Sequence, residues 1–299
     1  MTTHSLQADS AKPATTPFSG RIIRIVRGFF RLGPAFYLPS LWLMIVVFCA
    51  FFANLLPIAD PLYQDLLNME APPTSEHLFG TDNLGRDILS RAIHGSRISL
   101  TVGLIAPFIA MMIGTTMGVC AGYFRGRFEM AVVMYADTSL AFPGIVLLLL
   151  MVTYLGASLF NITVALGILF VPGYARVSRA NTLTFAQREF VTAAKALGAS
   201  HTRILVTQIL PNVLLPILAY SLIIIALMIV LEGVLSFLGL GVPAPAPSWG
   251  LMIQDGRELL ETAPHAAFIP AGVMFLTVLS FNMVGDTLRK RMDSREAKF

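Results

Sequence analysis

Charged residues are scarce in this 299-residue chain, where Asp, Glu, Lys and Arg together make up only 13% of the sequence. A soluble domain carries about 25% charged residues, and a disordered chain combines high charge with few apolar residues. Both classes are therefore excluded for the bulk of a chain that is 56% hydrophobic, with a mean hydropathy of +0.73. The class that remains is an all-α membrane protein that crosses the bilayer several times.

Groups that carry chemistry are scarce too. The two cysteines, Cys49 and Cys120, lie in apolar runs and provide neither a disulfide framework nor a set of zinc ligands. The five histidines are scattered without a pair at helical spacing, so no metal site is predicted. There is no Gly-x-x-x-x-Gly-Lys-Ser/Thr phosphate loop and no Ser/His/Asp or paired-carboxylate set. We therefore expect no catalysis, and no cofactor, in this chain.

Long apolar runs are what the sequence does have. The hydrocarbon core of a bilayer is about 30 Å thick and needs about 20 apolar residues per helix. Five intervals without a charged residue are long enough: 32–59, 98–124, 138–175, 204–231 and 262–285. The third interval is too long for one helix and is interrupted at 156–158, so it predicts two. The sequence thus predicts six transmembrane helices.

Two of these helices bring acidic residues into the membrane region. The first helix of the third interval has to begin near Met130, which places Asp137 in or beside the membrane, and Pro143 predicts a kink in it. Pro211 and Pro216 shift the following span to about 214–238. Glu232 then lies inside that span, where a carboxylate is rare.

The orientation follows from positive charge. Of the 21 Lys and Arg residues, 17 fall on the side of the N-terminus and four on the other, which predicts that both termini are cytoplasmic. Topology thus explains the basic composition, and no nucleic-acid partner is needed. Residues 21–31 alternate arginines with apolar residues, as in an amphipathic helix lying on membrane lipid. The predicted segments are a cytoplasmic tail (1–36), the first span (37–59), an outer loop (60–97), a transmembrane domain (98–286) with an inner segment (176–212), and a C-terminal tail (287–299).

The inner segment between the fourth and fifth spans has the clearest local signals. Thr184 and Gln187 fit a capping box that would start a short helix, and Gly198 would end it. Ser200 would cap a second helix, 201–210, which Pro211 would terminate. The segment could be an ordinary loop, or a protruding helix-turn-helix that docks into another protein.

The residues around Gly198, where the two short helices would meet, resemble a known family. Thr192-Ala-Ala-Lys-Ala-Leu-Gly198, followed by Gln208-Ile-Leu-Pro211, resembles the EAA loop of binding-protein-dependent ABC importers, although the family pattern has Glu at Thr192 and Ile at Gln208. In that family the loop is the coupling element that sits in a groove of the cytoplasmic ATPase. The residues that the resemblance assigns to coupling are Ala193, Ala194, Lys195, Leu197, Gly198, Ala199 and Pro211.

Further segments narrow the resemblance to the second permease subunit of dipeptide, oligopeptide and nickel importers. They extend from Phe79 to about Asp293 and include Gly80-Thr-Asp-Asn-Leu-Gly-Arg-Asp87, Gly122-Tyr-Phe124, Ala141-Phe-Pro143, Leu235–Gly241, Pro247-Ser-Trp-Gly250 and Gly285-Asp286. The resemblance implies a type I ABC importer permease fold in a bacterial inner membrane. It implies three kinds of partner: a homologous permease, two ATPase subunits that bind ATP and Mg, and a periplasmic or lipid-anchored solute-binding protein. The implied cargo is a di- or oligopeptide, with nickel or another peptide-like solute as the alternative.

Several residues keep two interpretations each. Glu232 and Asn282 could line the substrate pathway or join neighbouring helices. Asp137 and Asp286 could form a cytoplasmic gate with nearby arginines or cap solvated helix ends. Four residues of the outer loops could contact the binding protein or hold local structure: Asp82, Arg86, Asp87 and Trp249. In the structural interpretation, Asp82 caps a helix that starts near Leu84.

Two other function classes compete with an ABC permease. A self-sufficient channel or secondary transporter would work without ATPases and would use charges at the membrane midplane, where only Glu232 is expected here. An intramembrane enzyme would need the catalytic set that the sequence lacks. Co-purification of ATPase subunits distinguishes the three classes.

Overall fold

The computed structural model describes residues 33–296 of the chain, with side chains as far as Arg291. The amphipathic helix predicted at 21–31 and the last three residues lie outside the described part. Helices account for nearly all regular structure in that part, and one antiparallel bridge joins Thr81 and Asp87. The helices are α2 (Pro34–Phe52), α3 (Ile88–Phe124), α4 (Gly126–Ala141), α5 (Gly144–Leu155), α6 (Leu159–Ala186), α7 (Glu189–Ala196), α8 (His201–Ile204), α9 (Leu210–Phe237), α10 (Trp249–Gly256) and α11 (His265–Glu296).

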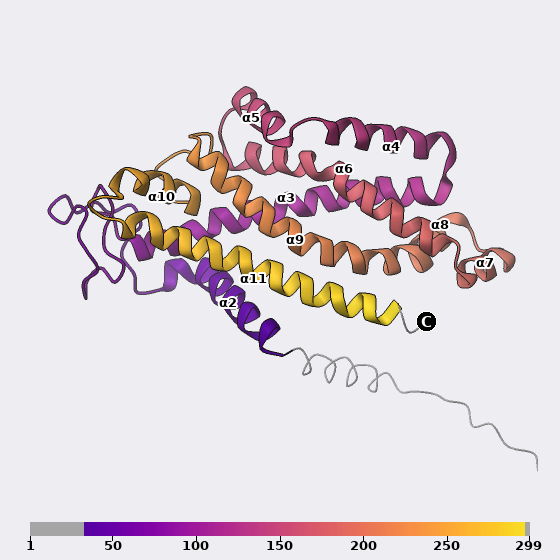
Figure 1. Cartoon of the computed structure of the whole chain (residues 1–299), viewed down its shortest axis with the longest axis horizontal. Helices are drawn as coiled ribbons and strands as arrows, with labels where there is room; N and C mark the ends of the chain where they lie inside the picture. Colours follow the sequence, from indigo (N-terminus) through magenta and orange to yellow (C-terminus); the bar gives the residue numbers. More distant parts are fainter. Residues whose placement is uncertain (1–32, 297–299) are drawn as a thin grey trace, which may run out of the picture.

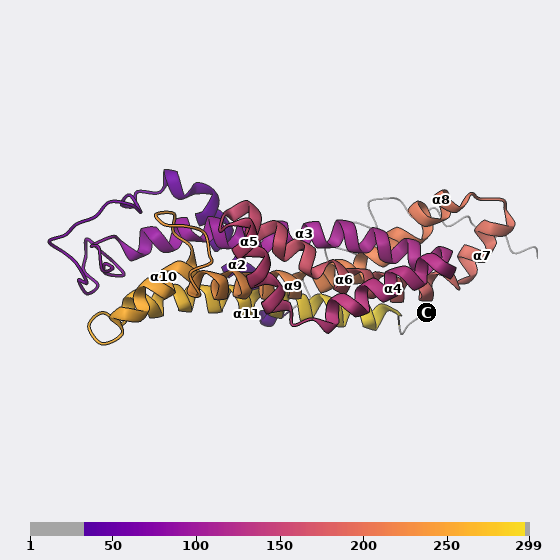
Figure 2. The same cartoon turned by 90° about the horizontal axis from the view of Figure 1, so that it is seen from above.

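Long apolar helices form an elongated bundle in which α3, α6, α9 and α11 run along the long axis (Figure 1). Within the described residues, five helices are long and apolar enough to cross a membrane. The bent pair α4 and α5 would make a sixth span, and its 87° bend lies at Phe142 and Pro143, where the kink was predicted. In both views, α7 and α8 occupy one end of the bundle, and α10 and the loop before α3 occupy the other (Figure 2).

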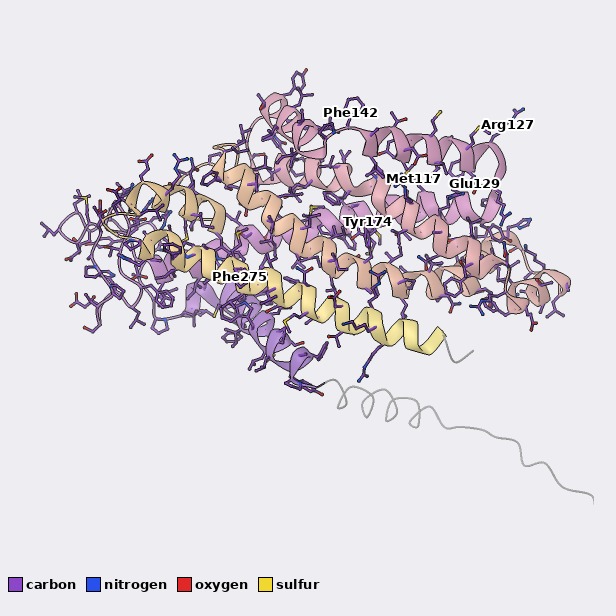
Figure 3. All side chains as sticks on the ribbon, in the orientation of Figure 1. Met117, Arg127, Glu129, Phe142, Tyr174 and Phe275 are labelled. Carbon is purple, nitrogen blue, oxygen red and sulfur yellow. The ribbon has the colours of Figure 1, made fainter. Side chains whose placement is uncertain are left out.

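The centre of the bundle is the contact between α3 and α6, which glycines make possible. A Cβ added at Gly114 would lie 2.6 Å from the Val171 carbonyl oxygen, and one added at Gly122 would lie 2.8 Å from Cβ of Thr182. The two backbones therefore approach more closely than alanine would allow. Small residues at such contacts are typical of membrane helices, which gain stability from packing and not from exclusion of water. Tyr174 fills the middle of the bundle beside this contact and is fully buried (Figure 3).

Several predicted boundaries are wrong. Thr184 does not cap a helix: it lies inside α6, where its hydroxyl donates to the Ala180 carbonyl oxygen, because α6 continues beyond the apolar interval to Ala186. Pro211 does not end a helix either. The chain passes from α8 through a π-helical segment, Leu205–Ile209, directly into α9, and Pro211 occupies the first turn of α9, where its missing N–H costs nothing.

The helix of the second span also begins earlier than its apolar interval. α3 starts at Ile88 and includes two arginines, Arg91 and Arg97, which the charge-free criterion had placed in the loop. Arg97 is accommodated by hydrogen bonds from Nε to the Ala50 carbonyl oxygen (2.6 Å) and from Nη1 to Oδ1 of Asn54 (2.8 Å). The residue that caps α3 is Asp87, whose Oδ1 accepts from the Ser90 N–H at 2.7 Å, so the cap and helix predicted at Asp82 and Leu84 are wrong.

Candidate functional sites at the two ends of the bundle

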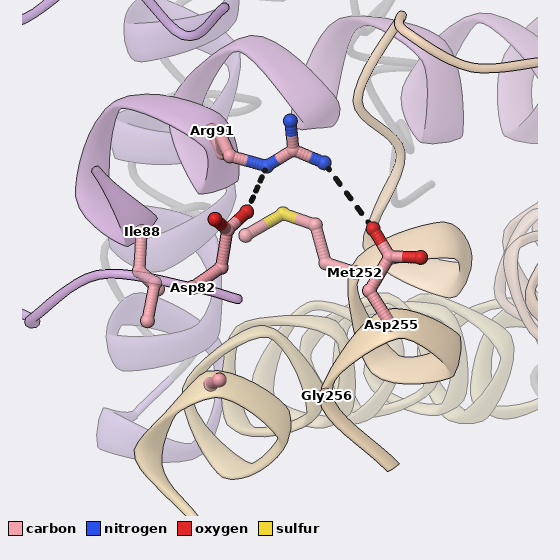
Figure 4. A pocket seen from close by; sticks show the side chains of 7 residues that line it. Asp82, Ile88, Arg91, Met252, Asp255 and Gly256 are labelled. Carbon is pink, nitrogen blue, oxygen red and sulfur yellow. Dashed lines mark ion pairs between the residues drawn. The ribbon is translucent and has the colours of Figure 1, made fainter. Parts of the chain in front are cut away.

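Four charged side chains at the α10 end of the bundle form a group that we call the charge cluster, in which Asp255 is partly exposed and the others are buried: Asp82, Arg86, Arg91 and Asp255. Oδ2 of Asp82 accepts from Nε of Arg86 at 2.7 Å and lies 3.3 Å from Nε of Arg91. Arg86 also lies 3.3 Å from Oδ2 of Asp255. Arg91 lies 3.6 Å from the same oxygen and so bridges Asp82 and Asp255 (Figure 4). Arg91 is 1% exposed and Asp82 6% exposed. The cluster therefore joins the loop before α3 to α10, inside the protein.

Burial and charge act in opposite directions on the carboxylate of Asp255. Desolvation raises its pKa above the ordinary value, and the attraction of Arg91 and Arg86 opposes that rise. A cavity of about 10 Å³ adjoins the cluster, enough space for one water molecule. It is lined by Met252 and Gly256 as well as by Asp82, Arg91 and Asp255. Each carboxylate of the cluster has two arginine partners, which offset the loss of water around the buried charges. The cluster therefore acts to hold the loop before α3 against α10.

Asp87 and Trp249 are buried as well. Besides capping α3, Asp87 lies 2.9 Å from Nδ1 of His77 through Oδ2. Trp249 is fully buried, and its indole Nε1 donates to the Ala92 carbonyl oxygen at 2.9 Å. The burial of these side chains within the chain favours the local structural interpretation over a contact with the binding protein.

Glu232 lies inside α9 and is fully buried. Its Oε2 accepts from the Ser99 hydroxyl at 3.0 Å, and its Oε1 accepts from the Ser236 hydroxyl at 2.8 Å. No ion pair joins Glu232 to a cationic side chain between residues 33 and 291. Ser99 also accepts from the Trp249 N–H, at the first turn of α10. Glu232 therefore connects α3, α9 and α10, and its position favours helix joining over a place in an open pathway.

The acidic residues nearer the other end form two ion pairs, and only one of them involves an acidic residue of the predicted gate. Asp137 pairs with Arg176 at 2.6 Å, and both side chains are more than half exposed. Arg179 pairs with Glu129 at 2.6 Å, and Glu129 lies between α4 and α6 (Figure 3). Glu129 was not among the predicted site residues, although it stands two turns before Asp137 on the same helix. A cavity of about 160 Å³ lies beside these pairs.

Asp286 and Asn282 make no contact with that group. Asp286 is exposed and has no ion pair in the described part of the chain. The Asn282 side-chain amide donates to the Val278 carbonyl oxygen of its own helix at 3.0 Å. The gate predicted from Asp137, Asp286 and nearby arginines is therefore not assembled here, apart from the pair of Asp137 with Arg176.

Residues 187–204 protrude from the other end of the bundle, and we call them the α7–α8 knob (Figure 2). One side of the knob is anchored: Val191 is fully buried and Ile204 is 1% exposed, and both belong to the main apolar core. The other side is open: Leu197 is 88% exposed, and Ala193, Lys195 and Gly198 are exposed too. Ala194 and Ala199 lie between, partly buried against the core.

The bend of the knob is a Schellman motif. Gly198 has a φ of +77°, its N–H donates to the Lys195 carbonyl oxygen, and the Ala199 N–H donates to that of Ala194, both at 3.0 Å. Gly198 thus follows the helix as predicted, and Ser200 accepts from the Arg203 N–H as the predicted second cap. No atom lies within 4 Å of the place where a Cβ would stand on Gly198. A partner can therefore approach the backbone of the bend directly.

A comparison with protein families matches residues 114–298 to the family described as "Binding-protein-dependent transport system inner membrane component". The chain belongs to this family. It is therefore a permease subunit of an ABC importer and a multi-pass protein of the bacterial inner membrane, as the resemblance implied. Permeases of this family work with ATPase subunits and substrate-binding proteins.

Relatives of this permease support the same assignment. The chain is 39% identical over 257 residues to the glutathione transport system permease protein GsiD of Pectobacterium atrosepticum, covering 86% of this chain and 85% of the relative. The GsiD proteins of Escherichia coli O6:K15:H31 and Shigella sonnei match with the same identity and coverage.

A solved structure of inward facing conformations of the MetNI methionine ABC transporter contains a chain of similar fold. Its TM-score is 0.56 at 19% identity, covering 68% of this chain and 97% of that chain. This likeness concerns the fold alone. Together with the helical architecture it confirms a type I ABC permease fold with five or six apolar spans.

Proposed function

We propose that this permease moves di- or oligopeptides, or a peptide-like solute, into the cell by ATP-driven transport. The names of the relatives support a peptide cargo, since glutathione is itself a peptide. In this proposal the chain has six spans, counting α4 and α5 as one, and both termini are cytoplasmic. It pairs with a homologous permease and receives its cargo from a solute-binding protein on the outer side. It contributes no cofactor, because ATP and Mg bind to two partner ATPase subunits.

The exposed bend of the α7–α8 knob is the observation that carries the coupling part of the proposal. Leu197 is an apolar side chain that is 88% exposed at a water-facing end of the protein, beside the open backbone of Gly198. An exposed apolar side chain beside an open backbone offers a partner both a surface to bury and a close approach. We assign that partner as the ATPase, with Ala193, Lys195, Leu197 and Gly198 at the contact.

ATP binding would bring the two ATPase subunits together and displace the knobs seated in them. The displacement would then change the packing of the long helices, between a state open to the inside and a state open to the outside. In thermodynamic terms, ATP and the loaded binding protein favour different packings of one bundle. We propose that four polar residues line the inner part of the path. They are the pair Asp137 and Arg176 on α4 and α6, and Asn282 and Asp286 on α11.

The test of coupling is Gly198→Trp in the assembled importer reconstituted in liposomes. An indole at this bend would occupy the open space and hold the ATPase away from the knob. We expect normal insertion, loss of solute uptake, and loss of the ATP hydrolysis that the binding protein stimulates. Undiminished uptake would contradict the docking role.

Gly239→Trp is the matched control. Gly239 ends α9 in the same Schellman geometry, with the same φ of +77° and with no atom within 4 Å of an added Cβ. It stands at the opposite end of the bundle, near α10. The backbone strain is therefore the same in both variants, and only Gly198→Trp should uncouple transport from ATP hydrolysis.

The cargo is tested on the cognate solute-binding protein by calorimetry with dipeptides, glutathione and nickel complexes. We expect binding of a peptide. Binding of a nickel complex alone would replace peptide by nickel as the cargo and leave the coupling proposal intact.

A further inference from the structure

The α7–α8 knob is attached to three long helices, of which only two are its neighbours in the chain. α6 precedes it and is separated from α7 by two residues, Gln187 and Arg188. α9 follows it through the π-helical segment Leu205–Ile209. The third helix, α3, reaches the knob through side chains at its last turn, far from the knob in sequence.

The contact with α3 is made mainly by Tyr123, beside Phe124, whose ring centroid lies 6.1 Å from that of His201. The hydroxyl of Tyr123 lies 2.9 Å from Nδ1 of His201 at the start of α8, and the two rings meet edge to face with centroids 5.7 Å apart. Nζ of Lys195 lies 5.4 Å from the centroid of the Tyr123 ring, within the range of a cation–π interaction. Tyr123 thus contacts both sides of the bend, one residue in α7 and one in α8.

α3 and α6 form a tight pair directly behind this contact. Gly122, the residue before Tyr123, packs against Thr182 so closely that no Cβ would fit, and Gly114 repeats the contact two turns earlier against Val171. Packed helices of this kind transmit displacement instead of deforming, because interiors have few voids. A push on the knob that reaches Tyr123 therefore acts on α3 and α6 together.

The connection to α9 has a different character. In the segment Leu205–Ile209 the hydrogen bonds skip five residues, as from the Leu210 N–H to the Leu205 carbonyl oxygen, and Pro211 follows without an N–H of its own. Such π-helical turns interrupt the regular bonding of a helix and occur frequently at functional sites. This segment is therefore the place where the knob can turn relative to α9.

We propose that Tyr123 is a positioning residue of the coupling step, which through His201 makes the knob move with the α3–α6 pair. The segment Leu205–Ile209 then takes up the displacement relative to α9. This inference rests on the proposed function, since it requires an ATPase that moves the knob. It adds α3 to the path of coupling, beside α6 and α9, the two helices that adjoin the knob in the chain.

The test measures ATP hydrolysis by the complete importer in liposomes, with and without the loaded binding protein. The readout is the ratio of stimulated to basal hydrolysis, because damage to the fold would lower both rates together. Tyr123→Phe removes the hydroxyl but keeps the ring, and the ratio should fall about threefold; Tyr123→Ala removes both contacts, and the ratio should fall about tenfold. The binding-protein concentration for half-maximal stimulation should stay at its wild-type value.

Two further variants make the result specific. His201→Ala combined with Tyr123→Phe should be no worse than His201→Ala alone, since the hydroxyl contact that Tyr123→Phe removes is already lost with His201. Tyr154→Phe is the matched control, because that ring on α5 is 89% exposed and distant from the knob, and it should keep the wild-type ratio.

The inference is overturned if Tyr123→Ala keeps the wild-type ratio of stimulated to basal hydrolysis, or if the losses add in the double variant. If Gly198→Trp still uncouples the importer in that case, the proposed coupling stands without it. If Gly198→Trp also leaves stimulation intact, the proposed coupling itself fails, and the inference fails with it.

Discussion

The two ends of this permease carry sequence motifs that differ in composition and in burial. At the α10 end, the charged residues of the motif from Gly80 to Arg91 turn inward, and Arg91 is 1% exposed. At the α7–α8 end, the small and apolar residues of the motif turn outward, and Leu197 is 88% exposed. The arginine of the first motif is shielded from solvent by this chain itself, whereas the leucine of the second motif is left uncovered by it. The first motif thus serves the fold of this chain, and the second is suited to a partner.

Arg91→Ala is the strongest way to break this comparison. The substitution leaves the carboxylates of Asp82 and Asp255 with fewer cationic partners, and removal of one member of a buried ion pair costs about 3–5 kcal/mol. We expect a large fall in the thermal midpoint of the purified permease in detergent.

The control for Arg91→Ala lies at the other end of the bundle. Leu197→Ser changes an exposed side chain, so its effect on stability should stay within about 0.5 kcal/mol. If Leu197→Ser destabilised the permease as much as Arg91→Ala, the distinction between the two ends would be lost.

Glu232→Gln sharpens the comparison with a smaller effect. Glutamine keeps the shape of the side chain, and the hydroxyls of Ser99 and Ser236 can each donate or accept, so the junction of α3, α9 and α10 should survive at a cost of about 1 kcal/mol. We expect near-normal uptake. A specific rise in the concentration of solute needed for transport, with unchanged stability, would instead show that Glu232 contacts the cargo.

The sequence predicted the long helices correctly, because apolar runs of about 20 residues have few other solutions in a bilayer. It failed where helices continue into water. Charge marks the end of the membrane but not the end of a helix, so α6 passes Arg176 and Arg179 and extends to Ala186. Pro211 was misread for a related reason: a proline in the first turn of a helix starts that helix instead of ending the preceding one.

The candidate sites divided along the same line. The helix end at Gly198 and the helix cap at Ser200 could be predicted, since caps depend only on neighbours in the chain. Which charges meet was not readable, because the pairing of Arg179 with Glu129 depends on how α4 folds back on α6 after the tight turn at Arg125. For the same reason nothing in the sequence indicated that Asp255 would join Asp82.

The most direct test of the central claim, that the open bend of the α7–α8 knob is covered by a cytoplasmic partner, is cysteine labelling of Leu197→Cys with Cys49 and Cys120 replaced by Ala. A membrane-impermeant maleimide should label the permease produced without its ATPase subunits in inside-out vesicles. It should not label the same permease in spheroplasts, where only the outer side of the membrane is accessible. It should fail to label the importer assembled with its ATPase subunits. Equal labelling of the free permease and the assembled importer, or labelling from the outer side, would contradict the claim.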